Sequence, residues 1–221
     1  MGRKKIGVLL AGCGVKDGSE IHEATLTLYF LCKHGAEYVC MAPDKAQADV
    51  VNHCKEEVTG ETRNVLVEAA RIARGNIINV RDVKAGDIDG IIIPGGFGAA
   101  KNLSTFAFEG PDCHADEDAS RLLRELHAAG KPIGALCIAP TLLARLFGPD
   151  FNVTLTIGSD PATASALEKM GSRHVVSGVD GIVTDTANRV VSTPCYMLAE
   201  NIGEVGDGVE KLVVEVLNMA G

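Results

Sequence analysis

The sequence predicts an α/β fold in which a mostly parallel central sheet is covered by helices on both faces. Short apolar runs of strand length alternate with amphipathic stretches of helical spacing along the chain, which is the pattern of a parallel sheet between two helical layers. The 25 glycines suit the tight turns of such folds. A chain of 221 residues without a repeat or a linker-like segment is expected to form one domain, residues 1–221.

The first half of the chain alternates strands and helices. Apolar runs predict strands from Lys5 to Ala11, from Tyr38 to Ala42 and from Ile88 to Ile93. Apolar residues at helical spacing predict helices from about Ser19 to His34, from Asn64 to Ala73 and from Asp116 to Ala129. Ser19 is the expected N-cap of the first helix, and Gly35 its stop. We expect residues 44–63 to form a polar excursion with short helical pieces, followed after the second helix by irregular structure to Asp87.

The second half continues the alternation. A buried strand ends at Leu136, and a helix is expected to begin at Ile138. The remaining predicted strands are Val153 to Ile157, Val175-Val176, and a hairpin of Ile182 to Thr184 with Val190 to Ser192. The remaining predicted helices are Pro161 to Met170, starting near Asp160, and Tyr196 to about Leu217.

Cys137 stands where we place the chemistry. It follows a short apolar strand, a helical pattern begins at once after it, and small residues stand two positions before and two after it, Ala135 and Ala139. This is the pattern of a nucleophile elbow, a sharp strand-to-helix turn that exposes its central residue in strained geometry. A helix N-terminus behind the sulfur favours a thiolate. The alternative is a buried cysteine that packs as a small hydrophobe.

Two other groups are expected beside Cys137, because ligands collect at the carboxyl ends of parallel strands. The turn Gly95-Gly96 ends a predicted strand, and its N–H groups, with that of Ile138, are candidates for an oxyanion hole. The first helix carries Glu20 and Glu23 one turn apart. Either could face the strand ends and share a proton with the sulfur.

Four further side chains are candidates to act on or bind the substrate. His22 is a candidate base, with a surface histidine as the alternative reading. Asn102, with the charged groups of Arg63 and Lys101, is a candidate to bind a carboxylate near Gly98. We assign Asn102 to substrate binding.

The composition excludes several classes of protein. The net charge of −8 and a pI of about 5.2, without a basic stripe, argue against nucleic acid as a partner. No apolar run approaches the roughly 18 residues that span a bilayer, so no membrane association is expected. Seven scattered cysteines without a Cys-x-x-Cys pair argue against a disulfide framework and a zinc site. We therefore expect no metal, no cofactor and a cytoplasmic location.

At these residues the chain resembles the ThiJ/PfpI superfamily. The similar segments are 17–23, Pro94-Gly95-Gly96 and Cys137. The runs 19–24, 62–66, 95–103 and 137–140 are similar to its ElbB branch of isoprenoid biosynthesis proteins with an amidotransferase-like domain. The resemblance implies a flavodoxin-like three-layer sandwich of the class I glutamine amidotransferase-like type. Counting back from Gly35, it favours Glu23 over Glu20 as the partner of Cys137.

The resemblance also implies an activity. It points to a cofactor-independent glyoxalase that converts glyoxal, and less well methylglyoxal, to the 2-hydroxy acid through a thiolate of Cys137. Since members of the superfamily are often dimers, it also implies a homodimer. No histidine follows Cys137 and no late His-x-Glu is present, so peptidase and glutaminase activities are not expected. The alternatives are a redox or stress sensor with an oxidisable elbow cysteine, and a non-catalytic partner protein linked to isoprenoid biosynthesis.

Overall fold

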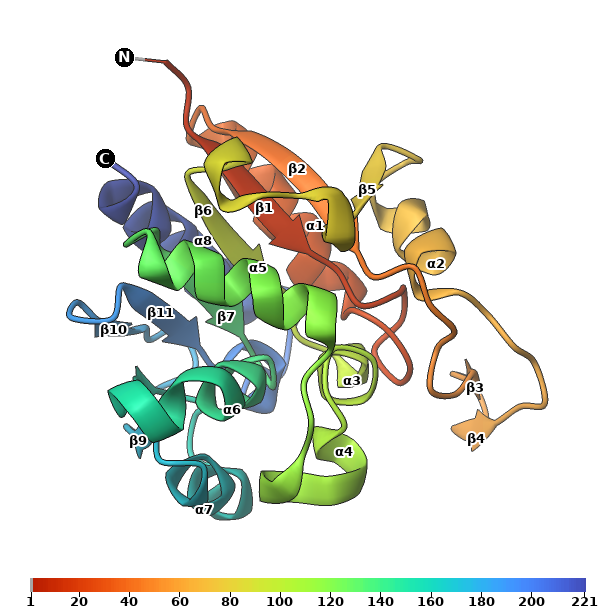
Figure 1. The fold of residues 1–221 in the computed structure, drawn as a ribbon. Helices are drawn as coiled ribbons and strands as arrows, with labels where there is room; N and C mark the ends of the chain where they lie inside the picture. Colours follow the sequence, from red (N-terminus) through yellow and green to blue (C-terminus); the bar gives the residue numbers. More distant parts are fainter. Residues whose placement is uncertain (1) are drawn as a thin grey trace.

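The computed structural model, which describes residues 2–221, is built around a seven-stranded sheet of order β10-β11-β7-β6-β1-β2-β5 (Figure 1). All neighbouring strands are parallel except β10 and β11. The strands are β1 (Lys5–Leu9), β2 (Glu37–Ala42), β5 (Ile77–Asn79), β6 (Gly90–Ile93), β7 (Ile133–Leu136), β10 (Val183–Asp185) and β11 (Val190–Thr193). The mostly parallel central sheet predicted from the sequence is confirmed.

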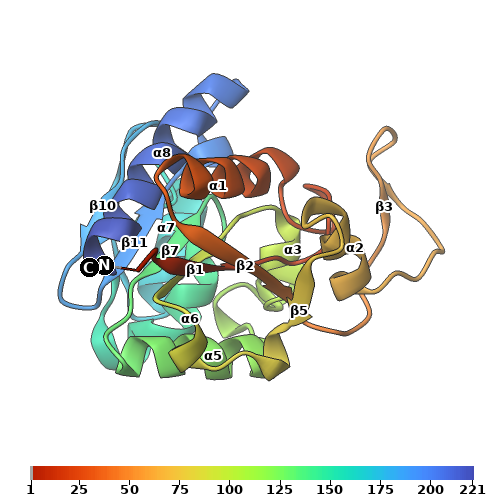
Figure 2. The same cartoon turned by 90° about the horizontal axis from the view of Figure 1, so that it is seen from above.

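Helices cover both faces of this sheet. They are α1 (Ile21–Lys33), α2 (Val65–Ile72), α3 (Phe97–Lys101), α4 (Phe106–Glu109), α5 (Glu117–Ala128), α6 (Pro140–Phe151), α7 (Pro161–Lys169) and α8 (Ile202–Met219). Figure 2 shows α1 and α8 on one side of the sheet and α5 and α6 on the other. Each side has its own apolar core cluster, because the central strands are buried on both faces and send alternate side chains to each. The sheet and the helices on its two faces therefore form a three-layer sandwich.

The topology brings the carboxyl ends of β1, β6 and β7 together. Strand β6 pairs with β1 on one side and with β7 on the other, in parallel register. The chain therefore leaves these three neighbouring strands at the same edge of the sheet. The turns that follow them lead into α1, α3 and α6, so segments distant in sequence meet there.

Several predicted boundaries differ from the structure. The N-cap of α1 is Glu20, whose side chain accepts a hydrogen bond from the Glu23 N–H. Ser19 instead accepts one from the Ala11 N–H, so the expected Ser19 cap was wrong. The helix after the elbow begins at Pro140 rather than Ile138. The predicted last helix is split into a 3₁₀ turn, η4 (Cys195–Met197), and α8.

Short strands account for the other differences. The edge strand β5 lies in a stretch expected to be irregular, and the excursion at 44–63 contains a two-stranded pair, β3 (Val51–Asn52) and β4 (Glu57–Val58), rather than helical pieces. The predicted strand at 153–157 is reduced to β8 (Thr154–Leu155). It pairs outside the main sheet with β9 (Arg173–His174), which ends just before the predicted Val175-Val176. Short pairings like these leave little periodicity in a sequence.

Within residues 2–221, no helix combines the length and the apolar character needed to cross a membrane. Helix α8 has 18 residues, but several of them are charged.

Two helical glycines should respond to alanine in opposite directions. A Cβ on Gly148 in α6 would lie 2.2 Å from the Met170 carbonyl oxygen, whereas a Cβ on Gly206 in α8 would meet nothing within 4 Å. We expect Gly148→Ala to lower the free energy of unfolding by about 1–3 kcal/mol through overpacking. Gly206→Ala should raise it by up to about 1 kcal/mol through helix propensity. Urea denaturation measures both, and equal effects would contradict this packing of α6.

Candidate active site

Cys137 lies at the turn between β7 and α6. Its backbone has φ 57°, a left-handed conformation that is uncommon and strained for a residue other than glycine. The Cys137 N–H donates to the Thr193 carbonyl at 2.9 Å, which extends the pairing of β7 with β11 by one residue. The side chain is only 7% exposed. Held in this way, the sulfur has the position and strain expected of a nucleophile elbow.

The partner of Cys137 is Glu23, in the first turn of α1. Its side chain is fully buried. One carboxyl oxygen accepts a hydrogen bond from the Gly95 N–H at 2.8 Å, and the other accepts one from the Tyr196 N–H at 3.4 Å. The carboxyl also interacts with the Cys137 thiol. Glu20, the other candidate, is occupied as the helix cap, so the geometry decides between the two glutamates in favour of Glu23.

Burial raises the pKa of both members of this pair. The pKa of Glu23 rises from 4.5 to about 8, first because burial disfavours its charge and second because Glu20 is close; the Gly95 and Tyr196 N–H groups oppose the rise. The pKa of Cys137 is also raised, by burial and then by the charge of Glu23, against the N–H groups of Gly96 and Ile138. Two acids that interact this closely titrate as one unit.

The thiolate predicted at neutral pH is therefore not the resting form of the free site. A helix beginning at Ile138 was expected to stabilise the thiolate. Helix α6 begins at Pro140 instead, so its N-terminus lies further from the sulfur. The effect of a helix dipole falls off within one turn, and burial of the sulfur raises the pKa of the thiol. At neutral pH the pair holds its protons, and its singly protonated form becomes more abundant as the pH rises.

The predicted oxyanion groups divide into two kinds. The Gly95 N–H is already bonded to Glu23, so it is not free for a substrate. The N–H groups of Gly96 and Ile138 interact with the sulfur, and both residues line the cavity over it. Gly96 has φ 90°, a conformation that suits glycine and that turns the chain sharply after β6. These two donors are the ones positioned near a reacting atom.

The other predicted residues lie further from the sulfur. His22 is exposed, and its Nδ1 is 2.7 Å from the Tyr196 hydroxyl. It therefore reaches the cavity only through Tyr196. The buried Asn102 amide donates to the carbonyls of Ala11 and Asp17, and its oxygen accepts from the Ala48 N–H. With its groups engaged by the backbone, Asn102 does not line the cavity and serves to tie neighbouring loops together.

A cavity of about 440 Å³ opens over Cys137. The sequence reasoning identified its floor but missed its walls, which come from α3, α4, α7, η4 and the loop after β1. The lining residues are Val15, Glu20, Gly96, Phe97, Ala100, Phe106, Ala107, Cys137, Ile138, Asp160, Thr163, Tyr196 and Met197. Among the wall residues, only Glu20, one turn from Glu23, and Phe97, directly after the Gly95-Gly96 turn, carried a sequence signal. The other walls depend on how distant elements pack.

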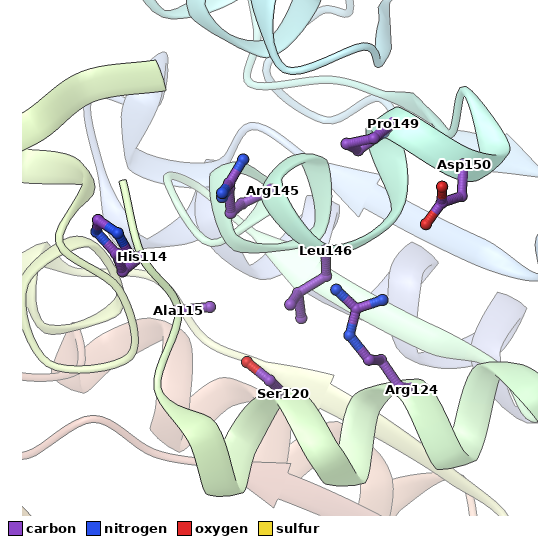
Figure 3. A pocket seen from close by; sticks show the side chains of 8 residues that line it. All are labelled: His114, Ala115, Ser120, Arg124, Arg145, Leu146, Pro149 and Asp150. Carbon is purple, nitrogen blue, oxygen red and sulfur yellow. The ribbon is translucent and has the colours of Figure 1, made fainter. Parts of the chain in front are cut away.

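Another cavity, of about 330 Å³, lies between α5 and α6 and holds no cysteine or paired carboxyl (Figure 3). Arg124 and Arg145 lie along it with His114, whose ring contacts Glu109 at 3.1 Å. Among residues 2–221, no three His, Cys, Asp or Glu side chains gather closely enough to hold a metal ion. The cavity over Cys137 is thus where a strained nucleophile and a buried acid meet.

This fold and this site define an α/β protein with a cysteine nucleophile elbow, on the class I glutamine amidotransferase-like fold. The chain belongs to the DJ-1/PfpI family, whose model matches residues 13–184. Its structure is similar to that of an isoprenoid biosynthesis protein with an amidotransferase-like domain from Ehrlichia chaffeensis, with a TM-score of 0.90 and 38% identity over 97% of this chain and 99% of that one. The fold, but not the detail, is shared with Drosophila melanogaster DJ-1beta (TM-score 0.55, 19% identity, 99% and 96% coverage).

Two curated relatives are similar over almost the whole chain. The rat "ES1 protein homolog, mitochondrial" is 43% identical over 99% of this chain and 85% of its own length. The human "Glutamine amidotransferase-like class 1 domain-containing protein 3, mitochondrial" is 43% identical over 98% of this chain and 84% of its own. Neither name gives a catalytic activity.

The expected cytoplasmic location is contradicted by these relatives, because the rat, human and zebrafish proteins are all named as mitochondrial. The expectation rested on seven scattered cysteines, all of them free in the structure. Free thiols are typical of reducing compartments. They do not distinguish one reducing compartment from another, so the inference went further than the chemistry allowed.

We expect Glu23→Gln to shift the alkylation of Cys137 to lower pH. The Glu23 charge raises the pKa of the Cys137 thiol, and glutamine keeps the shape while removing that charge. The rate of iodoacetamide labelling, followed by mass spectrometry from pH 6 to 10, should therefore rise earlier in the variant. The exposed Cys32 provides the reference in the same sample. An unchanged profile, or one displaced to higher pH, would contradict the pairing.

The buried acid also predicts how stability depends on pH. Between its unfolded pKa near 4.5 and its folded pKa of about 8, Glu23 binds a proton in the folded state that it loses on unfolding. Raising the pH through this window therefore lowers the free energy of unfolding, with a slope approaching 1.4 kcal/mol per pH unit, or about tenfold in the equilibrium constant. Urea denaturation should show Glu23→Gln gaining stability relative to wild type from pH 5 to 8. A pH-independent difference would contradict a buried neutral Glu23.

Proposed function

We propose that the protein is a cofactor-independent glyoxalase that converts glyoxal, and less well methylglyoxal, to the corresponding 2-hydroxy acid. The observation that carries this proposal is the buried contact between the strained Cys137 and Glu23, at the floor of an open cavity. A nucleophilic sulfur adds to aldehydes, and an acid with a pKa of about 8 can both donate and accept a proton near neutral pH.

The first step forms a bond between the sulfur and the aldehyde carbon. The reactive form of the pair carries one proton. Burial and the Glu23 charge raise the pKa of the Cys137 thiol, so this proton starts on the sulfur, and Glu23 accepts it as Cys137 attacks. The N–H groups of Gly96 and Ile138 stabilise the oxyanion that develops, where a single such donor contributes roughly 10²–10³ in rate. Glu23 then gives its proton to that oxygen, and the product of this step is a neutral hemithioacetal.

The second step moves a proton between the two carbons of the substrate. The Glu23 carboxylate removes the hydrogen from the carbon that carries the sulfur, and an enediol forms. Return of the proton to the neighbouring carbon gives a thioester of Cys137. Water hydrolyses the thioester, so that glyoxal and one water become glycolate and a proton, and the thiol is regenerated. No electron acceptor is consumed, because one carbon is oxidised as the other is reduced.

Cys137→Ala should abolish the consumption of glyoxal and the formation of glycolate. The matched control is Cys113→Ala, which removes a thiol that is also buried but belongs to the core on the α5–α6 side. Circular dichroism confirms that each variant is folded, and chromatography of glycolate measures turnover. We expect loss of activity only at Cys137, with Glu23→Gln reducing turnover by at least about 10²-fold. A Cys137→Ala protein that still formed glycolate would contradict the mechanism.

The same samples separate this proposal from the redox-sensor alternative. Mild peroxide followed by mass spectrometry shows whether Cys137 is selectively oxidised. Selective oxidation in a wild-type protein that forms no glycolate would favour a sensor.

A further inference from the structure

The cavity over Cys137 is much larger than glyoxal needs. Its volume of about 440 Å³ falls within the range of roughly 300–1,000 Å³ of pockets that enclose drug-sized ligands. Glyoxal consists of two carbons and two oxygens and would leave most of this space filled with water. The Gly96 and Ile138 donors and the sulfur account for only part of the lining, so volume remains for whatever group the aldehyde carries.

The walls of this volume are apolar. Phe97 from α3, Phe106 from α4 and Met197 from η4 contribute large side chains, and Ile138 adds another beside the sulfur. Phe97 is 49% exposed, so an aromatic ring at the rim of the cavity faces water in the free protein. Enclosing a substrate group against these side chains would remove apolar surface from water on both partners, which favours binding.

The charged groups at the cavity are all acidic. Glu20 and Asp160 line it, and no lysine or arginine is among its lining residues. Both carboxylates cap helices: Glu20 accepts from the Glu23 N–H and Asp160 from the Thr163 N–H, each at 2.7 Å. The neighbouring Lys101 lies over the Phe97 ring, with its ammonium group 5.7 Å from the ring centroid, and is paired with Asp49 at 2.7 Å.

This arrangement sets the charge that a substrate can carry. A carboxylate or phosphate in the cavity would be repelled by Glu20 and Asp160 and would find no lysine or arginine among the lining residues. The candidate carboxylate ligands considered in the sequence, Arg63 and Lys101, are paired with Glu61 and Asp49. The cavity therefore favours a neutral ligand.

We propose that the preferred substrate of this site is an uncharged 2-oxoaldehyde that carries an apolar group about the size of an aromatic ring. The inference rests on the proposed reaction of Cys137 with an aldehyde and adds the class of substrate. The aldehyde lies against Gly96 and Ile138, and the apolar group lies between Phe97, Phe106 and Met197.

The first experiment compares three substrates: glyoxal, phenylglyoxal and 4-carboxyphenylglyoxal. We expect kcat/KM for phenylglyoxal to exceed that for glyoxal by at least about tenfold, since a single well-placed methylene already contributes 10–200-fold in an apolar pocket. The added carboxylate should remove most of that gain. Equal or better use of glyoxal, or of the carboxylated compound, would overturn the inference.

Two variants on the same short helix test the position of the apolar group. Phe106→Ala should lower the ratio of the phenylglyoxal and glyoxal specificity constants several-fold, because the ring that encloses the substituent is lost. Phe108→Ala is the matched control, since Phe108 is 61% exposed and does not line the cavity. It should leave the ratio unchanged. A ratio that is the same in both variants would place the substituent elsewhere and overturn the inference.

A second experiment does not depend on turnover. Acetophenone, which is neutral, and benzoate, its anionic counterpart, are each added during iodoacetamide labelling of the protein. We expect acetophenone to slow the labelling of Cys137 several-fold, and benzoate to have little effect, with the exposed Cys32 as the unprotected reference.

The two experiments distinguish the failure of this inference from the failure of the proposed function. If no aldehyde is consumed but acetophenone protects Cys137 and benzoate does not, the glyoxalase proposal fails. The inference that the cavity selects neutral, apolar ligands then stands. If glyoxal is consumed but acetophenone gives no more protection than benzoate, the reaction stands and the substrate class is overturned.

Discussion

The organisation of the site depends on one buried carboxyl group. Glu23 is fully enclosed, and its oxygens meet the N–H of Gly95 after β6 and that of Tyr196 after β11, while the thiol of Cys137 follows β7. One side chain from α1 thus joins the ends of three strands. A buried carboxyl without such partners would be strongly destabilising. Here the partners reduce that cost, and the remaining penalty is expressed as a pKa of about 8. A proton is kept beside the sulfur as a result.

Close approach of the backbone makes this contact possible. A Cβ on Gly95 would lie 2.5 Å from the Cβ of Cys137 and 2.7 Å from a Glu23 oxygen. A Cβ on Gly98 would lie 2.5 Å from the backbone of Gly18. Glycine at these two positions lets the turn after β6 pass directly over the elbow and against the loop that leads into α1. The glycine turn that the sequence predicts as part of an oxyanion hole is therefore also a packing requirement.

The sequence was informative where local patterns decide the structure. A strand-to-helix turn and a glycine pair pointed to Cys137, Gly96 and Ile138. The first helix offered Glu20 and Glu23, and the family resemblance favoured Glu23. The predicted parallel sheet and the family resemblance also agree with the structure. The predictions that were wrong or missing concern properties that depend on tertiary packing. The ionisation of Cys137 is set by burial, which a one-dimensional pattern does not show. Phe106 and Met197 reach the cavity through short elements that lack clear periodicity.

The acidic groups of the cavity have a consequence for the direction of the reaction. A neutral aldehyde enters an apolar space that contains Glu20 and Asp160, and these groups do not oppose it. The proposed product is a 2-hydroxy acid, which ionises on release from Cys137 and then carries the same charge as both carboxylates. Repulsion in a partly enclosed, poorly solvated cavity is stronger than in open water. The charge distribution that excludes anionic substrates would thus also favour departure of the product, so substrate selection and product release follow from the same two helix caps.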